Sequence, residues 1–257
     1  MKMIHETAIV SKNAVLGKDV KVGAFAIIDD GVVVGDGCEI APRVHLRGGV
    51  TLGKRNYIGE GTLMGDRPQD TKFEEKESFV IVGDDNVIRE YATIHRATGE
   101  GGATRIGNGN FIMGYVHIAH EAEIKNNVVI VNASQIAGHA VVEDYAFVSS
   151  TVLVHQGTRI GAHSMIGGGC RITKDAMPFV MVVSEPAKNF GLNKVGLKRR
   201  GFDESRLKAL QSAYSILFRK KLMMKEALEM IKNEVEQTED VKRFVEFAEI
   251  SKRGIIR

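Results

Sequence analysis

The chain has 257 residues, of which 44% are hydrophobic and 26% are charged, and its formal net charge at pH 7 is +3. This balance argues against a disordered chain and against a membrane protein, because the apolar content suffices for a core and no run of eighteen apolar residues occurs. The first residues, Met1 to Glu6, lack the apolar stretch of a secretion signal, so we expect a cytoplasmic protein without a transmembrane segment.

The cysteine content and the charge distribution narrow the class of protein and its possible partners. Two cysteines, Cys38 and Cys170, cannot form a disulfide framework or a cysteine-rich metal site, so we expect both to be small buried side chains. Residues 190–257 carry 16 Lys and Arg against 10 Asp and Glu, a net charge of +6. This basic end favours an anionic partner. Nucleic acid is a poor candidate, because aromatic residues are not interleaved with the charges.

A six-residue repeat runs through most of the chain. From Ile4 to Ile172, every sixth residue is aliphatic at 26 of 29 positions. A small or β-branched residue often stands two positions earlier, and a glycine often follows directly. In an α-helix, aliphatic residues six positions apart would point about 240° away from one another, so they would not form one apolar face. In a strand, positions i−2 and i lie on the same face, and the glycine after them permits a bend. The repeat therefore predicts a mainly β protein, a parallel β-helix of hexapeptide repeats with three strands per coil.

The repeat fails at Asp70, Lys76 and Glu100 and ends after Pro178 and Pro186. We therefore predict a β-helix domain over residues 1–186, with projecting loops at 66–78 and 97–104, and a C-terminal α-helical domain over 187–257. Apolar residues at helical spacing predict helices at about 204–220, 222–236 and 240–252, the first capped by Asp203 and the third by Thr238. Insertions in a repeat protein often build its binding face.

The histidines are the candidates for chemistry, because all eight lie outside the two inward-facing positions of the repeat. Coils about 4.8 Å apart would stack several of them within roughly 10 Å on one side of the β-helix: His117, His120, His139 and His155, with Gly138 and Gln156. The chain has no glycine-rich phosphate loop and no nucleophilic Cys or Ser beside a base, which favours a histidine general base.

Two alternatives remain open for this cluster. Hexapeptide-repeat carbonic anhydrases bind zinc through histidines of adjacent subunits, but the spacing of His117 and His120 is not diagnostic on a strand and a third ligand would have to come from elsewhere. We therefore predict no metal. The second alternative is a non-catalytic trimeric scaffold that carries surface histidines.

Several segments together are more selective than the repeat, and with them the whole chain resembles the UDP-N-acetylglucosamine acyltransferases, which begin lipid A synthesis. The segments are Ile94-His95-Arg96, His117-Ile118-Ala119-His120, Ala137-Gly138-His139, Val154-His155-Gln156, Gly196-Leu197-Lys198-Arg199-Arg200-Gly201-Phe202 and Arg253-Gly254-Ile255-Ile256-Arg257. The resemblance implies a left-handed β-helix, an exception to the right-handed crossover rule, and a homotrimer with clefts between subunits.

The resemblance also implies a reaction and its catalytic groups. A (R)-3-hydroxyacyl chain would pass from acyl carrier protein to the 3-hydroxyl of UDP-N-acetylglucosamine, without a cofactor. His120 would be the general base, Glu121 would orient its ring, and the Gly138 N–H would stabilise the oxyanion.

Substrate-binding residues follow from the same resemblance. His117, His139, His155 and Gln156 would line the sugar and acyl site, and Asp70 and Lys72 would reach it from a neighbouring subunit. Asn193, Arg199 and Arg200 would hold the uridine diphosphate, since guanidinium groups suit phosphates. The basic end of the chain would face acidic acyl carrier protein.

Three residues bear on specificity. Glu121 stands where many family members have Asp, and Val195 stands where members that use the ordinary acceptor often have Glu. The second departure leaves an alternative open, in which the acyl group passes to the 3-amino group of the 3-amino sugar nucleotide analogue. The resemblance also implies that the family measures acyl length with a residue near the position of Gly168, where a bulky side chain would shorten the slot, so we predict a long 3-hydroxyacyl chain.

Overall fold

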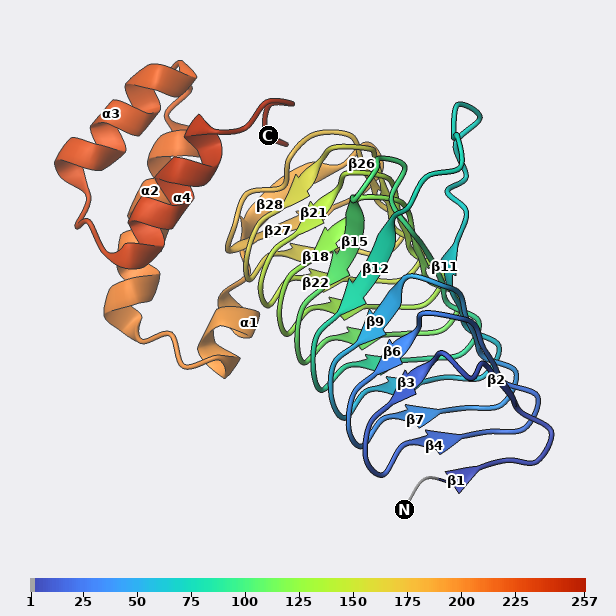
Figure 1. The fold of residues 1–257 in the computed structure, drawn as a ribbon. Coiled ribbons are helices and arrows are strands. Elements are labelled where there is room, and N and C mark those ends of the chain that lie inside the picture. The colour runs from blue at the N-terminus through green and yellow to red at the C-terminus, as the bar shows by residue number, and fades with distance from the viewer. Residues whose placement is uncertain (1–2) are drawn as a thin grey trace.

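Each six-residue repeat forms a short strand and a turn, and three repeats make one coil of a parallel β-helix (Figure 1). The computed structural model describes residues 3–257; residues 1 and 2, at the start of the predicted first domain, lie outside them. Equivalent residues of neighbouring coils pair eighteen positions apart, as Met3 pairs with Lys21 and Glu39 with Tyr57. The parallel β-helix predicted from the repeat is therefore confirmed.

Within the described residues, the β-helix has the shape of a three-sided prism, and one sheet forms each of its three walls. Sheet A contains β1 (Met3–Ile4), β4 (Lys21–Val22), β7 (Glu39–Ile40), β10 (Tyr57–Ile58), β13 (Val87–Ile88), β16 (Phe111–Ile112), β19 (Val129–Ile130), β22 (Phe147–Val148), β25 (Met165–Ile166), β27 (Val180–Val183) and β28 (Lys188–Leu192). Sheet B contains β2 (Ile9–Val10), β5 (Ile27–Ile28), β8 (His45–Leu46), β11 (Leu63–Asp66), β14 (Thr93–His95), β17 (His117–Ile118), β20 (Gln135–Ile136), β23 (Leu153–Val154) and β26 (Arg171–Ile172). Sheet C contains β3 (Val15–Leu16), β6 (Val33–Val34), β9 (Val50–Leu52), β12 (Phe79–Val82), β15 (Ala103–Ile106), β18 (Glu123–Ile124), β21 (Val141–Val142) and β24 (Arg159–Ile160).

The interior of the prism is filled by the two inward-facing positions of the repeat. Aliphatic residues such as Ile58 and Ile118 are fully buried, and so are Cys38 and Cys170, as predicted. Three asparagines also face inward as a ladder, in which Asn56 Oδ1 accepts from Asn86 and Asn86 Oδ1 accepts from Asn110. Backbone groups complete the pattern, since Asn56 Nδ2 donates to Gly83 O and Asn110 Oδ1 accepts from Val128 N, so these polar groups are tolerated inside the coil.

The glycine after the aliphatic position has a different role from the one predicted. A Cβ at Gly35 would lie 2.4 Å from the carbonyl oxygen of Gly53, and one at Gly161 would lie 2.4 Å from the nitrogen of Pro178. These glycines therefore allow neighbouring coils to approach closely. The left-handed backbone that turns the corner lies two residues later, and non-glycine residues also adopt it, among them Phe25, with a φ of 58°.

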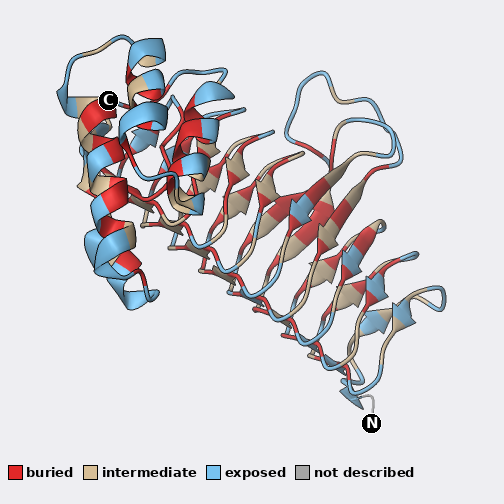
Figure 2. Cartoon of the chain, turned by 90° about the vertical axis from the view of Figure 1, so that its left-hand side faces the viewer, coloured by how far each residue is buried: buried red, intermediate tan, exposed pale blue. Residues whose placement is uncertain are grey.

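Two insertions project from the coils (Figure 1, Figure 2). Tyr57 pairs with Val87, thirty positions later, and Val87 pairs with Phe111, twenty-four positions later. A regular coil has eighteen residues, so the two insertions add twelve and six residues. The predicted loop bounds need correction. Asp66 belongs to β11, and the predicted loop 97–104 ends in β15, where Thr104 pairs with Val80 and faces the core.

The chain after residue 178 differs in part from the prediction. Strand β28 pairs antiparallel with β27, so the predicted division at 186/187 falls inside a hairpin of sheet A. The helices are α1 (Lys194–Arg199), which the spacing did not predict, α2 (Glu204–Arg219), α3 (Met224–Glu234) and α4 (Glu239–Glu249). The last three confirm the predicted helices within a few residues. Asp203 and Thr238 cap α2 and α4 by accepting backbone N–H bonds.

The helices pack at the C-terminal end of the β-helix (Figure 1). Tyr214 on α2 donates a hydrogen bond to Asn189 on β28, at 3.0 Å, and Arg159 on β24 lies over the ring of Phe247 on α4, at 4.4 Å. The segment after α4 returns to the β-helix, where Ile255 bridges to Asp175. Within residues 3–257, no helix combines the length and the apolar character needed to cross a bilayer.

Candidate active site

His120 lies at the corner where the chain leaves strand β17 of sheet B and turns toward β18 of sheet C. Its side chain is mostly buried, with 11% of its surface exposed. Glu121, the next residue, has a φ of 51°, in the left-handed region. This turn directs the carboxylate back toward the imidazole instead of away from it.

Glu121 and His120 form a close pair, in which Glu121 Oε2 lies 2.5 Å from His120 Nδ1. Glu121 Oε1 accepts three further hydrogen bonds from the second projecting loop: from Thr98 N and Thr98 Oγ1 at 2.7 Å each, and from Gly99 N at 3.2 Å. Burial alone would raise the pKa of Glu121, but the bonds from Thr98, His120 and Gly99 outweigh it and lower the pKa. The carboxylate is therefore ionised at neutral pH, and its second oxygen can orient the imidazole through Nδ1, leaving Nε2 for a substrate.

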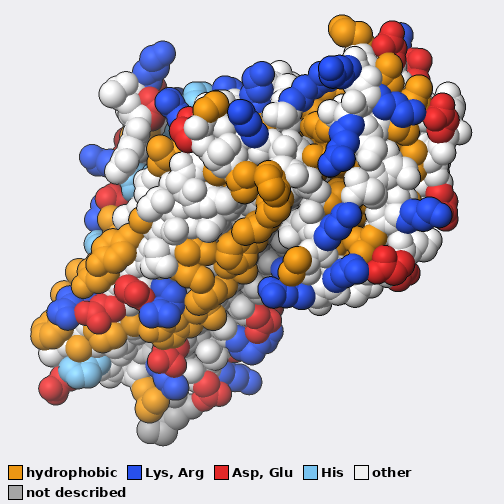
Figure 3. All heavy atoms as spheres, turned by 180° about the vertical axis from the view of Figure 1, so that it is seen from behind, with side chains coloured by type: hydrophobic (Ala, Val, Ile, Leu, Met, Phe, Trp, Pro, Cys, Tyr) orange, Lys and Arg blue, Asp and Glu red, His pale blue; other side chains and the backbone are white. Residues whose placement is uncertain are grey.

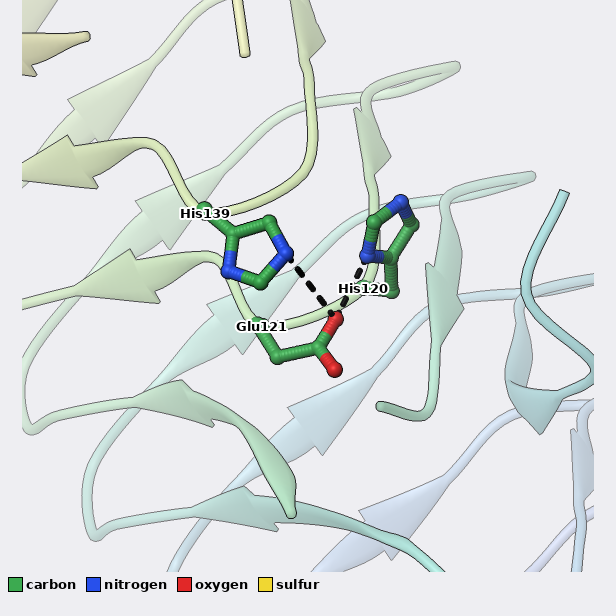
Figure 4. Close-up of side chains that lie close together, drawn as sticks. All are labelled: His120, Glu121 and His139. Atoms are coloured by element: carbon green, nitrogen blue, oxygen red, sulfur yellow. Dashed lines mark hydrogen bonds and ion pairs between the residues drawn. The ribbon is translucent and has the colours of Figure 1, made fainter. Parts of the chain in front are cut away.

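His139 stacks one coil above His120 and approaches the same carboxylate (Figure 4). Its Nε2 lies 3.8 Å from Glu121 Oε2, and the two imidazole rings meet edge-on at 5.3 Å. About half of its side chain is exposed. The structure thus places His139 beside the His120–Glu121 pair.

A cleft of about 430 Å³ opens over sheet B in front of His120. It is lined by five residues of the predicted site, His117, His120, Gly138, His155 and Gln156, whereas His139, which was also predicted to line it, is absent from the lining. The predicted gathering of these groups on one wall is observed. Sequence reasoning did not select Gln135, Leu153 and Arg171, which also line the cleft. Their signal is spacing, because they follow His117 at successive steps of eighteen residues and pair with it in register across β20, β23 and β26.

Gly138 lies against the imidazole of His120. A Cβ at this position would lie 2.4 Å from His120 Cε1 and 2.6 Å from Nε2, so no larger residue fits while the ring stays in place. Within the described residues the Gly138 N–H has no backbone acceptor. It is therefore free to donate to an oxygen bound beside His120 Nε2.

His117, which is half-buried and lines the cleft, packs against the buried His95. Their rings meet edge-on at 5.0 Å, and His117 Nδ1 lies 2.8 Å from Thr93 Oγ1. Burial, with His95 and His120 nearby, lowers the pKa of His117 to about 4. His117 is therefore neutral at neutral pH. His95 is 5% exposed although it occupies no inward position of the repeat, a burial that the repeat did not predict.

The residues predicted to hold the uridine diphosphate gather in a second pocket, of about 510 Å³. Asn193, Arg199 and Arg200 line it together with Tyr145, Phe147 and Met165 of the sheet A wall. Asn193 also caps α1, and the Arg200 guanidinium lies 4.4 Å above the ring of Tyr145. Sequence reasoning missed Tyr145. Within one chain this pocket and the His120 cleft lie on different walls of the prism.

Three predicted residues lie apart from the His120 cleft. Asp70 and Lys72 are exposed on the first projecting loop, where Asp70 accepts from the Lys72 N–H, and their neighbour Gln69 lines the cleft instead. Gly168 lies at the corner between β25 and β26, and a Cβ there would meet Ser150 at 3.4 Å, an ordinary contact. One chain thus leaves Asp70, Lys72 and Gly168 outside the site.

The His120 cluster also has the donors of a metal site. Ligand atoms of His120, Glu121 and His139 lie within 4.8 Å of one another. Two imidazoles and one carboxylate are a donor set that zinc accepts. The zinc alternative therefore has a specific location in this structure.

Comparison with known proteins first defines the class. A family model described as bacterial transferase hexapeptide (six repeats) matches residues 13–46 and 31–66. A UDP-N-acetylglucosamine acyltransferase from Bacteroides fragilis superposes with a TM-score of 0.97 at 38% identity, covering 99% of this chain and 100% of that one. One from Francisella novicida superposes with a TM-score of 0.96 at 39% identity, covering 99% and 94%. The chain is a left-handed β-helix protein of the hexapeptide-repeat transferase class, as predicted.

Sequence relatives then define the family. The model described as UDP N-acetylglucosamine O-acyltransferase, domain 2, matches residues 175–256. The chain is 47% identical over 256 residues to the acyl-[acyl-carrier-protein]–UDP-N-acetylglucosamine O-acyltransferase of Syntrophobacter fumaroxidans, covering 99% of both. It is 46% identical over 258 residues to that of Thermodesulfovibrio yellowstonii, covering 100% of both. The chain therefore belongs to the UDP-N-acetylglucosamine O-acyltransferase family.

Proposed function

We propose that this protein transfers a (R)-3-hydroxyacyl group from acyl carrier protein to the 3-hydroxyl of UDP-N-acetylglucosamine, the first step of lipid A biosynthesis. The observation that carries the proposal is the His120–Glu121 pair beside Gly138 in the sheet B cleft, in a chain whose close relatives are named for this transfer. We also propose that the protein works in the cytoplasm, because its proposed substrates, acyl carrier protein and a UDP-sugar, are found there in bacteria.

In the proposed step, His120 Nε2 removes the proton of the sugar hydroxyl as its oxygen attacks the thioester carbonyl carbon. The Gly138 N–H donates to the oxyanion that forms. The tetrahedral intermediate then collapses, the carbon–sulfur bond breaks, and the thiol of the carrier leaves with the proton that His120 took. The products are the 3-O-acyl sugar nucleotide and free acyl carrier protein, and no cofactor is consumed.

We further propose that the active unit is a homotrimer in which the cleft of one subunit faces the second pocket of its neighbour. The His120 cleft and the pocket with Asn193, Arg199 and Arg200 lie on different walls of one chain, so a second copy is needed to join them. Apolar residues also align in register along the outside of sheet A: Val87, Phe111, Val129, Phe147 and Met165. Figure 3 shows hydrophobic side chains gathered in a band along the β-helix, a surface suited to a subunit contact.

The acyl donor is the second partner. Acyl carrier protein is acidic, and the net charge of +6 on residues 190–257 favours a salt-sensitive encounter with it. Many Lys and Arg side chains are visible over this end of the molecule (Figure 3).

The 3-amino acceptor is the second candidate function. Val195 lines the second pocket together with Asn193 and is 63% exposed. Because valine has no carboxylate, this position cannot offer the acceptor the contact that a glutamate would. The names of the relatives favour the hydroxyl. Purified protein offered both sugar nucleotides and a ladder of acyl carrier protein thioesters will distinguish them by product mass. We expect an ester of a long 3-hydroxyacyl chain; a product made only from the amino sugar would establish the alternative.

The zinc hypothesis needs a separate measurement, because it uses the same residues. Elemental analysis of the purified protein is expected to find substoichiometric zinc, together with acyl transfer that survives chelator treatment. A wild-type protein that binds stoichiometric zinc and transfers no acyl group, and a His139→Ala variant that has lost the zinc, would instead support a hydratase on this scaffold.

A further inference from the structure

The second projecting loop is attached to the rest of the structure at several points. Ala97 is fully buried, and its carbonyl accepts a hydrogen bond from Ser78 Oγ at 2.6 Å. Further along, Gly101 N donates to Glu77 O of the first loop at 2.8 Å. Thr98 follows Ala97 directly, so its backbone is fixed by neighbours on both sides.

The two oxygens of Glu121 have separate partners. Oε2 faces the imidazoles of His120 and His139, at 2.5 and 3.8 Å. Oε1 takes all three donors of the second loop, two of them from Thr98. A glutamate beside the base has one more rotatable bond than an aspartate, and a carboxylate that loses its partners on Oε1 is free to rotate away from His120.

We propose that Thr98 is a positioning residue for the acyl transfer, and that its hydroxyl and N–H, with the Gly99 N–H, hold Glu121 in the orientation that fixes the His120 ring. The inference rests on the function proposed above. Thr98 is absent from the lining of the cleft, so it acts through Glu121 and not on the substrate.

The charge of the pair depends on the same bonds. The ionisable groups that face Glu121 are His120 and His139, and His95 and His117 lie behind His120. Three donors on Oε1 stabilise the anion, whereas loss of one makes the carboxylate more basic. A more basic carboxylate also holds the Nδ1 side of the His120 ring, 2.5 Å away, more strongly.

The test compares Thr98→Val, which removes the hydroxyl at nearly constant volume, with Thr98→Ser, which keeps it. The control is Thr51→Val, at an exposed position on β9. For Thr98→Val we expect kcat to fall roughly tenfold with an unchanged KM for the sugar nucleotide, and the acidic limb of the kcat/KM profile to move up by about one pH unit. Thr98→Ser and Thr51→Val are expected to resemble the wild type in both measurements.

A titration that does not depend on turnover keeps this inference separate from the function. Histidine ring ¹⁵N resonances of the wild type and of Thr98→Val are followed against pH, with His120→Ala to assign His120. A shifted His120 titration in the valine variant, absent in the serine variant, supports the inference even if the wild type transfers no acyl group. An unshifted titration overturns it, and so does an equal loss of activity in both Thr98 variants with an unchanged pH profile.

Discussion

Glu121 follows His120 directly in the chain, and its carboxylate nevertheless turns back to place Oε2 2.5 Å from His120 Nδ1. Glu121→Gln keeps the size of the side chain but removes the charge that stabilises the imidazolium formed during proton transfer. We expect kcat to fall by about 10- to 100-fold, which corresponds to the loss of a charge-assisted hydrogen bond, with little change in KM. Glu123→Gln, at an exposed carboxylate on β18, is the control for steady-state kinetics. An unaltered kcat in Glu121→Gln would remove the carboxylate from the account.

Gly138 makes room for the imidazole of the base. In Gly138→Ala the new methyl group would lie 2.4 Å from His120 Cε1, so the ring must rotate or the coil must shift. We expect kcat to fall by at least tenfold while the thermal unfolding temperature changes by only a few degrees. Gly114→Ala is the matched control, because the nearest atom to its Cβ would be Glu90 Oε1, at the end of a flexible side chain 3.2 Å away. Equal activities of the two variants would show that the ring is not confined at Gly138.

Arg200 has a different expected signature, because it belongs to the second pocket. Its guanidinium lies over the Tyr145 ring, where a cation–π contact holds it toward the pocket that we assign to the uridine diphosphate. Arg200→Ala should raise KM for the sugar nucleotide by about tenfold or more and leave kcat nearly unchanged. Tyr145→Leu should raise KM by a smaller factor. A lower kcat at constant KM in both variants would contradict this placement.

Two half-buried histidines, His117 and His163, predict how stability depends on pH. Burial lowers the pKa of His117 and of His163 to about 4, for His163 with the positive charges of Arg200 and Arg243 nearby. The unfolded chain, with histidine pKa values near 6.5, takes up protons that the folded chain does not, so acidification from about pH 6.5 to about pH 4 destabilises the protein. Because water still reaches both side chains, the loss for each histidine is smaller than the roughly 3 kcal/mol that an unscreened shift of this size would give.

His163→Phe isolates one of these contributions. His163 stacks between Tyr145 and Phe179, at ring distances of 4.8 and 5.6 Å, so a phenyl ring can replace the imidazole. Thermal unfolding temperatures, measured at one protein concentration between pH 4 and 7, should depend less steeply on pH in the variant. Parallel curves for the wild type and the variant would mean that His163 titrates as freely when folded as when unfolded.

The fold could be predicted from the sequence because its period is short and regular. Each aliphatic residue of the six-residue repeat occupies the same position in its coil, so Ile118 or Ile160 alone predicts little, whereas the whole series predicts the fold. The inward asparagines escaped prediction, because Asn56, Asn86 and Asn110 are polar and are satisfied only through their stacking and through backbone groups of neighbouring coils. Strand β28 and helix α1 also escaped, since their residues follow neither the six-residue nor the helical period.

The candidate site could be predicted where coil stacking determines it. His120, Gly138 and Gln156 repeat at eighteen residues and therefore meet, and the same interval from His117 would have found Gln135 and Arg171. Thr98 could not be found in this way, because it lies on an inserted loop outside the eighteen-residue spacing. Its contact with Glu121 therefore follows from the shape of the loop and not from the repeat. Asp70 and Lys72 would reach a site only from a neighbouring subunit in the proposed trimer, and the repeat does not encode how such a subunit would be placed.

The central claim is that His120 is the general base for acyl transfer in the sheet B cleft. The most direct test is the initial rate of transfer from a (R)-3-hydroxyacyl carrier protein to UDP-N-acetylglucosamine by the wild type and by His120→Ala. Because general-base catalysis contributes about 10²- to 10⁴-fold, we predict a loss of that size with the fold retained. A His120→Ala variant that transfers acyl groups at the wild-type rate would contradict the account.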